Sequence, residues 1–282
     1  MSDWIRFSLR LLVPKSFEGV DIAGAAYRRP AGQERRYCNQ QSHEAQNSWV
    51  TLFTGTRIVR CISMNVFVAG GTGYIGRPLI DSLLQDRHTV RAVARPGSEN
   101  KLPAGCEKVI GNALDASSYQ GQVAPSDTFV HLVGVAHPGP GKKQQFLEID
   151  LKSIEAAVVA AKFAGIRHFV YVSVAHPAPV MRDYIGVRSR GEELIRDAGL
   201  NATILRPWYV LGPGHRWPYA LVPVYMLLRA IPATRDSATR LGLVSHGEMV
   251  GALRSAVREP AAGIRIIGVP EIRKAGRLGV RR

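Results

Sequence analysis

The sequence predicts an α/β fold, a doubly wound parallel sheet with helices on both faces. Three observations carry this prediction. Short apolar runs alternate with amphipathic helical patterns from residue 64 to about residue 270, a glycine cluster follows the first run, and a later run is apolar almost throughout. Strands that are buried on both faces have this continuous apolar character, so the sheet is expected to be parallel and covered by helices.

The folded region is expected to begin at Met64. Residues 1–63 lack sustained helical or strand periodicity and include the polar stretch RRPAGQERRYCNQQSHEAQNS. We interpret them either as a disordered extension or as the product of a start codon placed upstream of Met64. The expected domain therefore covers 64–270, with a small substrate-side subregion at 206–245 and a basic C-terminal tail at 271–282.

The predicted elements follow one another in order along this domain. The first strand ends at Ala69, and the helix after it places Ile75, Leu79 and Leu83 on one face. Further strands are predicted at 88–94, 109–110, 128–133, 169–174, 202–205 and 264–269. Helices are predicted at 149–164 and 184–198, and Ser245 and Glu248 have capping-box spacing before a last apolar helix pattern.

Composition limits the class of protein. The chain has 282 residues, 46% of them hydrophobic, which suits a globular fold with a sizeable core. The three cysteines are scattered without a C-x-x-C pair, so no disulfide framework and no metal site are expected, and a cytoplasmic location is predicted. The net charge of +15 is spread along the chain, and no motif indicates specific nucleic-acid binding.

No run reaches the roughly 18 apolar residues that a membrane span requires. The longest approach is Tyr219–Leu228, which Pro223 interrupts. This run is interpreted as a lid over the substrate or as a homodimer face, and peripheral membrane contact is the least favoured alternative. The glycine-rich stretch 138–143 lacks the residue order of a phosphate-gripping P-loop and is predicted to be a mobile loop.

The segment GGTGYIG at 70–76 joins the first strand to the first helix. Gly70 permits a tight turn, Gly73 lets the backbone approach a pyrophosphate, and Gly76 lets the helix lie close to the sheet. The helix N-terminus adds N–H groups and a partial positive charge. Because the pattern follows a strand and opens an amphipathic helix, it predicts that a dinucleotide cofactor binds here.

Arg95 ends the second strand, where a site that prefers NAD would usually hold an acidic residue. A guanidinium at this point favours the 2′-phosphate of NADP, and NAD is the alternative cofactor. Arg91 competes with Arg95 for this role, and Arg95 is otherwise a solvated arginine at a strand end.

The GGTGYIG loop and the βα series after it resemble the short-chain dehydrogenase/reductase superfamily, especially its atypical NmrA-like and complex I 39-kDa-subunit-like members, which are related to the epimerase/dehydratase group. The segments GNALD, HFVYVSV and ILRPWYVLGPG extend the resemblance to about residue 270. A Rossmann-like fold is implied, with GNALD lining the adenine pocket although Asn112 replaces the usual Asp. With Arg95, the expected cofactor-binding residues are Gly70, Thr72, Gly73, Tyr74, Ile75, Gly76, Asn112, Gly134 and Pro207.

Tyr184 and Arg188 stand four residues apart on one helical face. The pair resembles the Tyr-x-x-x-Lys pair of this superfamily, with Arg in the lysine position, and Ser173 falls near the place of its serine. The resemblance implies that Tyr184 exchanges a proton with a carbonyl or hydroxyl oxygen that Ser173 binds, while hydride passes to or from the nicotinamide. The alternative is that Tyr184 is a partly buried aromatic residue that covers the site.

His137, His176 and His215 each follow a predicted strand, so they are expected at the carboxyl edge of the sheet, where ligands bind in such folds. His215, with the adjacent Arg216, is the preferred substrate-side candidate. For each histidine the alternative is an ordinary hydrogen bond within a loop.

These observations predict an NADP(H)-dependent oxidoreductase that acts on a small carbonyl or alcohol substrate. Two alternatives stay open at this point. One is a sensor or assembly protein that holds NADP(H) without turnover. The arginine at position 188, where the superfamily has lysine, supports this alternative. The other is an epimerase or dehydratase of the sugar-nucleotide type, which the same fold supports.

Overall fold

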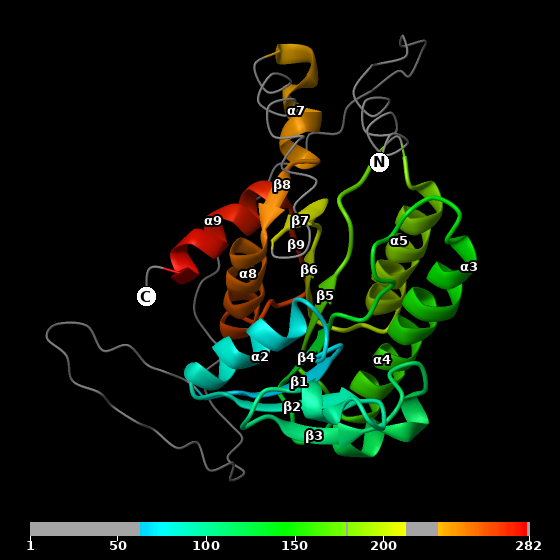
Figure 1. Cartoon of the computed structure of the whole chain (residues 1–282), viewed down its shortest axis with the longest axis vertical. Coiled ribbons are helices and arrows are strands. Elements are labelled where there is room, and N and C mark those ends of the chain that lie inside the picture. The colour runs from blue at the N-terminus through cyan, green and yellow to red at the C-terminus, as the bar shows by residue number, and fades with distance from the viewer. Residues whose placement is uncertain (1–62, 179, 213–230, 281–282) are drawn as a thin grey trace, which may run out of the picture. The chain divides into compact units, whose positions relative to one another are not determined.

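A computed structural model describes residues 63–178, 180–212 and 231–280 of the chain (Figure 1). Seven parallel strands form its main sheet, in the order β3-β2-β1-β4-β5-β6-β9. Their bounds are β1 Asn65–Ala69, β2 Thr89–Ala94, β3 Glu107–Ile110, β4 Thr128–His131, β5 His168–Val172, β6 Ala202–Leu205 and β9 Ile264–Ile267. The strand order reverses direction between β1 and β4, and a crevice for ligands opens at such a point at the carboxyl ends of the strands.

Helices cover both faces of this sheet, as Figure 1 shows. The first face is packed by α2 (Gly76–Gln85), α8 (His246–Arg258) and α9 (Val269–Val280). The second face is packed by α4 (Lys152–Phe163) and α5 (Arg182–Asp197). The two hydrophobic clusters alternate along the central strands β1, β4 and β5, so the structure confirms the predicted doubly wound α/β fold.

Strand β1 illustrates how the sequence sets this arrangement. Val66 and Val68 face the α2 and α8 side, whereas Phe67 faces the α4 side. Phe67 lies in register with Phe129 of β4, which lies in register with Phe169 of β5. The ring centroids in this row are 5.1 and 5.2 Å apart. Aromatic contacts of this kind add about 0.5–1.5 kcal/mol each to the free energy of burial, so the row ties three strands together.

Shorter elements complete the described fold. The second sheet pairs β7 (Tyr209–Leu211) with β8 (Leu243–Ser245) in parallel. The remaining segments are η1 Glu99–Lys101, η2 Ala116–Ser118, η3 Gln120–Gln122, α3 Lys143–Gln145, the π-helical turn η4 Phe146–Leu151 and α7 Pro232–Arg240. The predicted capping box before α8 is confirmed, because Ser245 and Glu248 each bond the other's backbone N–H.

Two strands end earlier than the sequence predicts. β4 stops at His131 instead of Val133, and β5 stops at Val172 instead of Val174. Beyond β4 and at the end of β5, the carbonyl oxygens of Val133 and Val172 accept hydrogen bonds from the Arg188 guanidinium, at 3.4 and 3.0 Å. Both chain segments therefore leave the sheet where a side chain from α5 meets them.

The C-terminal segment differs from its predicted form as well. β9 ends at Ile267, and α9 occupies most of the range interpreted above as a basic tail. Val269 and Ile272 are buried on the α8 side of the sheet. A side chain at Gly251 of α8 would lie only 2.9 Å from the Cα atom of Gly276 of α9, so these two glycines let the helices pack closely. Burial of these apolar side chains against the core thus stabilises α9 as a helix.

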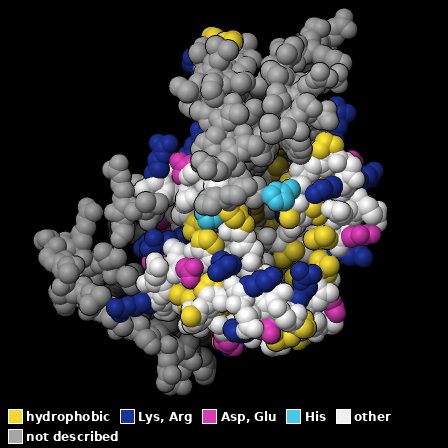
Figure 2. Space-filling model, viewed as in Figure 1, with side chains coloured by type: hydrophobic (Ala, Val, Ile, Leu, Met, Phe, Trp, Pro, Cys, Tyr) yellow, Lys and Arg dark blue, Asp and Glu magenta, His cyan; other side chains and the backbone are white. Residues whose placement is uncertain are grey.

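The described surface carries charges of both signs. In the view of Figure 2, Lys and Arg side chains are spread over the described face with Asp and Glu side chains among them. Across residues 63–178, 180–212 and 231–280, no helix combines the length and the apolar character needed to cross a membrane.

Two buried histidines predict that acid destabilises the fold. Burial, with a smaller contribution from Arg188, lowers the pKa of His131 to about 3. Burial, with a smaller contribution from Arg265, lowers the pKa of His168 to about 4. Between these values and the unfolded pKa of about 6.5, the unfolded chain binds protons that the folded chain does not, so the free energy of unfolding falls as the pH falls.

We expect the urea midpoint to be lower at pH 5 than at pH 7. Replacing His168 by Gln removes one of these titrating groups, so the variant should lose less stability over this interval than the wild type. Equilibrium urea unfolding followed by circular dichroism at both pH values checks this. An identical pH dependence for the two proteins would contradict the assignment.

Candidate functional site

The glycine loop lies at the point where the strand order reverses. Gly70 follows β1 with a φ of +90°, a region that favours glycine, and a Cβ atom there would lie 2.9 Å from the carbonyl carbon of Leu132, just after β4. A Cβ atom at Gly76 would collide with the carbonyl oxygen of Gly70 and would lie 2.8 Å from the Cα atom of Gly71. Helix α2 can therefore begin directly against the strand end only with glycine at these positions.

Gly73 is less confined than these two glycines. It is exposed, and the nearest atom to a Cβ placed there would be the Gly70 carbonyl oxygen at 3.2 Å. The N-cap residue of α2, Ile75, makes no side-chain capping hydrogen bond within the described chain. A helix N-terminus without a side-chain cap and with a bare glycine beside it fits a diphosphate group.

Tyr74 connects this loop to the C-terminal part of the described chain. Its ring centroid lies 4.4 Å from that of His246, the first residue of α8, and its carbonyl oxygen lies 3.0 Å from His246 Nε2. A side chain at Gly212, just after β7, would collide with the Tyr74 hydroxyl. The Tyr74 side chain is thus placed by residues distant in the sequence, while Thr72 and Ile75 lie on either side of it in the loop.

The two arginines of β2 and its end have different surroundings. Arg91 lies 2.8 Å from the carboxylate of Glu107 on β3 and donates to the carbonyl oxygens of Gln122 and Ala124. Arg95 is exposed at the strand end. The Arg91 guanidinium is engaged by β3 and the loop before β4, which leaves Arg95 as the better placed of the two for a ligand.

Asn112 lies in the turn after β3, on the same edge of the sheet. Its side-chain oxygen accepts from the Leu114 N–H at 3.1 Å, and its own N–H donates to the Ser118 hydroxyl at 2.9 Å. The residue is exposed. Its amide therefore shapes this turn.

Arg188 and Asp150 form a buried ion pair at the carboxyl ends of β4 and β5, with an N to O distance of 2.5 Å. Asp150 comes from the π-helical turn η4 and also accepts the Val135 N–H at 3.0 Å. Burial opposes the charge on Arg188, but Tyr184, Tyr171 and Asp150 outweigh it, and the pKa of Arg188 is raised. The guanidinium stays charged and fills the space above Gly134, where any side chain would collide with it.

Tyr184 lies next to this ion pair on α5. Its ring centroid is 5.3 Å from the Arg188 guanidinium carbon and 5.0 Å from the ring centroid of Phe146. The side chain is half-buried. The structure therefore brings Tyr184 and Arg188 together, as the spacing of four residues predicts.

Ser173 has a different partner. Its hydroxyl is buried and donates to the carboxylate of Glu192, one turn beyond Arg188 on α5, at 2.7 Å. Burial alone would raise the pKa of Glu192, but hydrogen bonds from Arg206 and Ser173 and the charge of Arg206 outweigh it and hold that pKa below its ordinary value. Glu192 thus stays ionised. It accepts hydrogen bonds from Ser173 just after β5, from Arg206 just after β6 and from Arg196 of α5.

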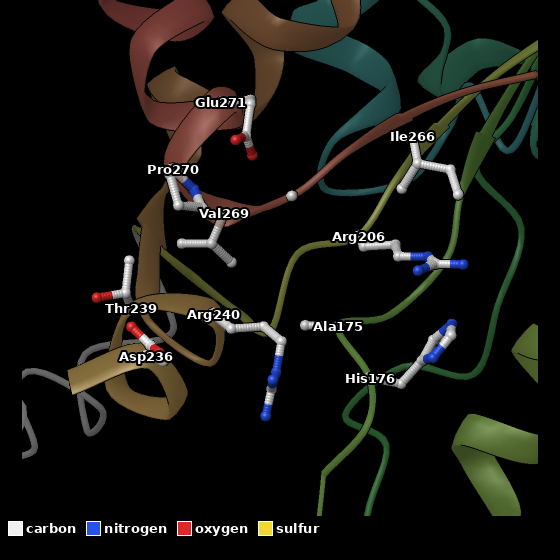
Figure 3. Close-up of a pocket in the computed structure, with 11 residues that line it drawn as sticks. Ala175, His176, Arg206, Asp236, Thr239, Arg240, Ile266, Val269, Pro270 and Glu271 are labelled. Carbon is white, nitrogen blue, oxygen red and sulfur yellow. The ribbon is translucent and has the colours of Figure 1, made fainter. Parts of the chain in front are cut away.

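A cavity of about 290 Å³ opens beyond Glu192, at the carboxyl ends of β5, β6 and β9 (Figure 3). Its lining includes Ala175 and His176 after β5 and Arg206 after β6, together with residues of α7, β9 and the start of α9. His176 Nε2 lies 3.5 Å from the Glu192 carboxylate. A cavity of this size suits part of a small ligand.

The other predicted residues lie at the same edge of the sheet. Pro207 is buried after β6, and its carbonyl oxygen accepts the Ala175 N–H at 2.9 Å. His137 is exposed after β4, away from the residues that line the cavity, and its carbonyl oxygen accepts from Lys142. The predicted residues His215 and Arg216, and the apolar run 219–228, lie outside the described residues.

Sequence reasoning missed Asp150, Glu192 and Arg240. Glu192 had a readable signal, since it follows Tyr184 and Arg188 at the same spacing of four on one helical face. Asp150 had none, because a π-helical turn shifts the helical register that periodicity relies on. Over residues 63–178, 180–212 and 231–280, no three His, Cys, Asp or Glu side chains gather as they would around a metal ion.

Comparison with known sequences identifies a family. A model of the NAD(P)H-binding family matches residues 70–220. The ceramide reductase of Caulobacter vibrioides is 24% identical over 213 residues, which cover 75% of this chain and 66% of that protein. The uncharacterized sugar epimerase YhfK of Bacillus subtilis is 30% identical over 154 residues, covering 51% of this chain and 71% of that protein. About a third of the ceramide reductase therefore has no counterpart in the alignment.

Solved structures show the same fold. The Bordetella bronchiseptica enzyme WbmH, solved in complex with NAD+, superposes with a TM-score of 0.55 at 19% identity over 73% of this chain and 75% of that one. The family match covers more than half of the 282 residues and begins at the glycine loop. The chain is therefore a nicotinamide-cofactor-binding protein of the NAD(P)H-binding family, within the atypical short-chain dehydrogenase/reductase and epimerase-like group.

Proposed function

We propose that the protein is an NADP(H)-dependent oxidoreductase acting on a small carbonyl or alcohol compound. The observation that carries this proposal is the glycine cradle at the strand-order reversal, with Tyr184 and a ligand-sized cavity at the strand ends further along the same edge. Relatives named as reductases support the reaction class.

The cofactor would be held by residues from four strand ends, those of β1, β2, β4 and β6. The backbone around Gly73 and the first turn of α2 would bind the diphosphate, and Arg95 would bind the 2′-phosphate of the adenosine ribose. Gly134 and Pro207 would line the nicotinamide end of the site. When bound, the nicotinamide ring supplies a hydride to a carbonyl carbon or accepts one from an alcohol.

Tyr184 would give its hydroxyl proton to the oxygen of a carbonyl substrate, or take a proton from an alcohol in the reverse direction. Arg188 would act as a positioning residue, because its guanidinium is committed to Asp150 and to two backbone carbonyl oxygens. The Ser173 hydroxyl donates to Glu192, so we assign Ser173 the role of positioning that carboxylate. To bind the substrate oxygen, the Ser173 hydroxyl would have to rotate away from Glu192.

The same commitment of Arg188 favours a second candidate function. A cation that is already paired with a buried carboxylate is less available to a tyrosine proton relay or a bound ribose than a free lysine. A protein that holds NADP(H) as a sensor or assembly factor needs the cradle without the relay. Epimerase chemistry is a third candidate, supported by the likeness to YhfK.

Cofactor preference tests the role of Arg95. The wild type should bind NADPH more tightly than NADH, and Arg95→Ala should weaken NADPH binding by about tenfold or more, since a charged hydrogen bond contributes roughly 1.5–3 kcal/mol. NADH binding should change little. Fluorescence titration of both cofactors measures this, and Arg91→Ala, whose guanidinium is paired with Glu107, is the matched control. Tighter NADH than NADPH binding by the wild type would refute the assignment.

Replacing Tyr184 by Phe tests the proton transfer. A screen of carbonyl and alcohol compounds with NADPH or NADP+ should yield a substrate, and Tyr184→Phe should lower kcat by roughly 100-fold or more while NADPH affinity stays within about twofold. If the Phe variant turns the substrate over at the wild-type rate, Tyr184 is not the proton donor. If the wild type binds NADPH but reduces none of the compounds, the result supports the sensor or assembly function over the oxidoreductase.

The buried ion pair predicts an asymmetric effect on stability. Arg188→Met leaves the Asp150 carboxylate buried without its partner and should lower the free energy of unfolding by about 3–5 kcal/mol. The double variant Arg188→Met, Asp150→Leu removes both charges and should recover most of this loss. Urea unfolding of the three proteins measures the difference. A single variant within about 1 kcal/mol of the wild type, or a double variant no better than the single one, contradicts a structural role for the pair.

A further inference from the structure

One wall of the cavity at the ends of β5, β6 and β9 holds three basic side chains. Arg206, Arg240 and His176 reach it from the end of β6, from α7 and from the loop after β5 (Figure 3). These three side chains come from separate elements and line one cavity, whereas the charges of both signs on the described surface are intermixed. The charge balance of this wall decides what it can hold.

The carboxylate of Glu192 offsets only part of this charge. Arg206 donates to both of its oxygens, at 2.9 and 2.5 Å, and Arg196 donates to one of them at 3.0 Å. One buried carboxylate therefore faces two guanidinium groups. Arg196 is not among the residues that line the cavity, so at the cavity wall Glu192 offsets the charge of Arg206.

Arg240 adds a charge that Glu192 does not offset. It is half-buried, its Nε atom is fully buried without a hydrogen-bond partner, and it forms no ion pair with the described residues. A half-buried guanidinium without a counter-ion is costly, and an anionic ligand beside it would offset its charge. Of the two arginines among the described residues that line the cavity, Arg206 is paired with Glu192 and Arg240 has no carboxylate partner, so Arg240 is the one that calls for an external anion.

Two carboxylates also line the cavity. Asp236 lies one helical turn before Arg240, and Glu271 lies in the first turn of α9. Both side chains are exposed, and Figure 3 shows Glu271 at the opposite end from His176. Water and salt screen exposed charges far more than buried ones, so these carboxylates weaken the positive potential around Arg240 without cancelling it.

Apart from Thr239 and Gly268, the rest of the lining is apolar, with Ala175, Ile266, Val269 and Pro270 contributing side chains. We propose that this cavity binds the anionic group of the substrate, a carboxylate or a phosphate, through Arg240, with an apolar part of the same molecule against the exposed side chains of Ile266 and Pro270. This inference rests on the proposed function and narrows its substrate class to anionic carbonyl or alcohol compounds.

Calorimetric titration of the full chain tests the inference with paired probes. The carboxylate probe is 4-methyl-2-oxopentanoate against its methyl ester, and the phosphate probe is dihydroxyacetone phosphate against dihydroxyacetone. NADP+ saturates the protein, so that no ketone is reduced during the measurement. At least one anion should bind about tenfold or more tightly than its neutral partner, as expected for a charge-assisted hydrogen bond.

Three variants separate Arg240 from general charge effects. Arg240→Gln should bring the ratio of anion to neutral affinity close to one, and Arg240→Lys, which keeps the charge, should retain part of it. Lys274→Gln removes an equal charge from an exposed position on α9 outside the cavity and should leave the ratio unchanged. Circular dichroism confirms that each variant is folded.

The outcomes distinguish this inference from the proposed function. An Arg240-dependent preference for either anion supports the inference and identifies the group, whereas no preference, or a preference that Arg240→Gln leaves intact, overturns it. The same anion titrations are run without NADP+, because the cavity lining does not include the glycine loop. A failed NADP+ titration therefore counts against the proposed function, and failed anion titrations count against the anionic substrate.

Discussion

The fold depends on one close approach of backbone to backbone. The chain after β1 passes the carbonyl group of Leu132 and then turns into α2 against its own preceding loop, at distances that leave no room for a side chain at Gly70 or Gly76. This contact sets where α2 starts, and α2 in turn covers Val66 and Val68 of β1. The exposed Gly73 lies between these two fixed points, so the diphosphate cradle is a consequence of how the helix joins the sheet.

Two buried carboxylates organise the other half of the site. Asp150 holds Arg188 at the ends of β4 and β5, and Glu192 holds Arg206, Ser173 and His176 at the ends of β5 and β6. A buried ion is tolerated when it is paired and hydrogen-bonded, and both carboxylates meet this condition. The pairing decides which cations remain for ligands, because it engages Arg188 and Arg206 and leaves Arg95 and Arg240 outside these pairs.

The sequence predicts most of the fold. It predicts the site only where residues that are close together in the sequence determine the geometry. Alternating apolar runs and the glycine spacing specify the parallel sheet and the cradle, since both depend on neighbouring residues. The partners of Ser173 and Arg188 depend on side chains brought in by η4 and α5, and no local pattern reveals which donor a buried carboxylate selects. Helix α9 was missed because its basic residues mask the buried Val269 and Ile272.

The small sheet of β7 and β8 has an evolutionary consequence. Its strands pair Tyr209 with Leu243, so the residues on either side of the intervening segment are held next to each other. When the two ends of a segment are held together in this way, its length and sequence can change without disturbing the seven strands of the main sheet. Relatives that share this scaffold are thus free to diversify what they recognise while inheriting the same coenzyme module.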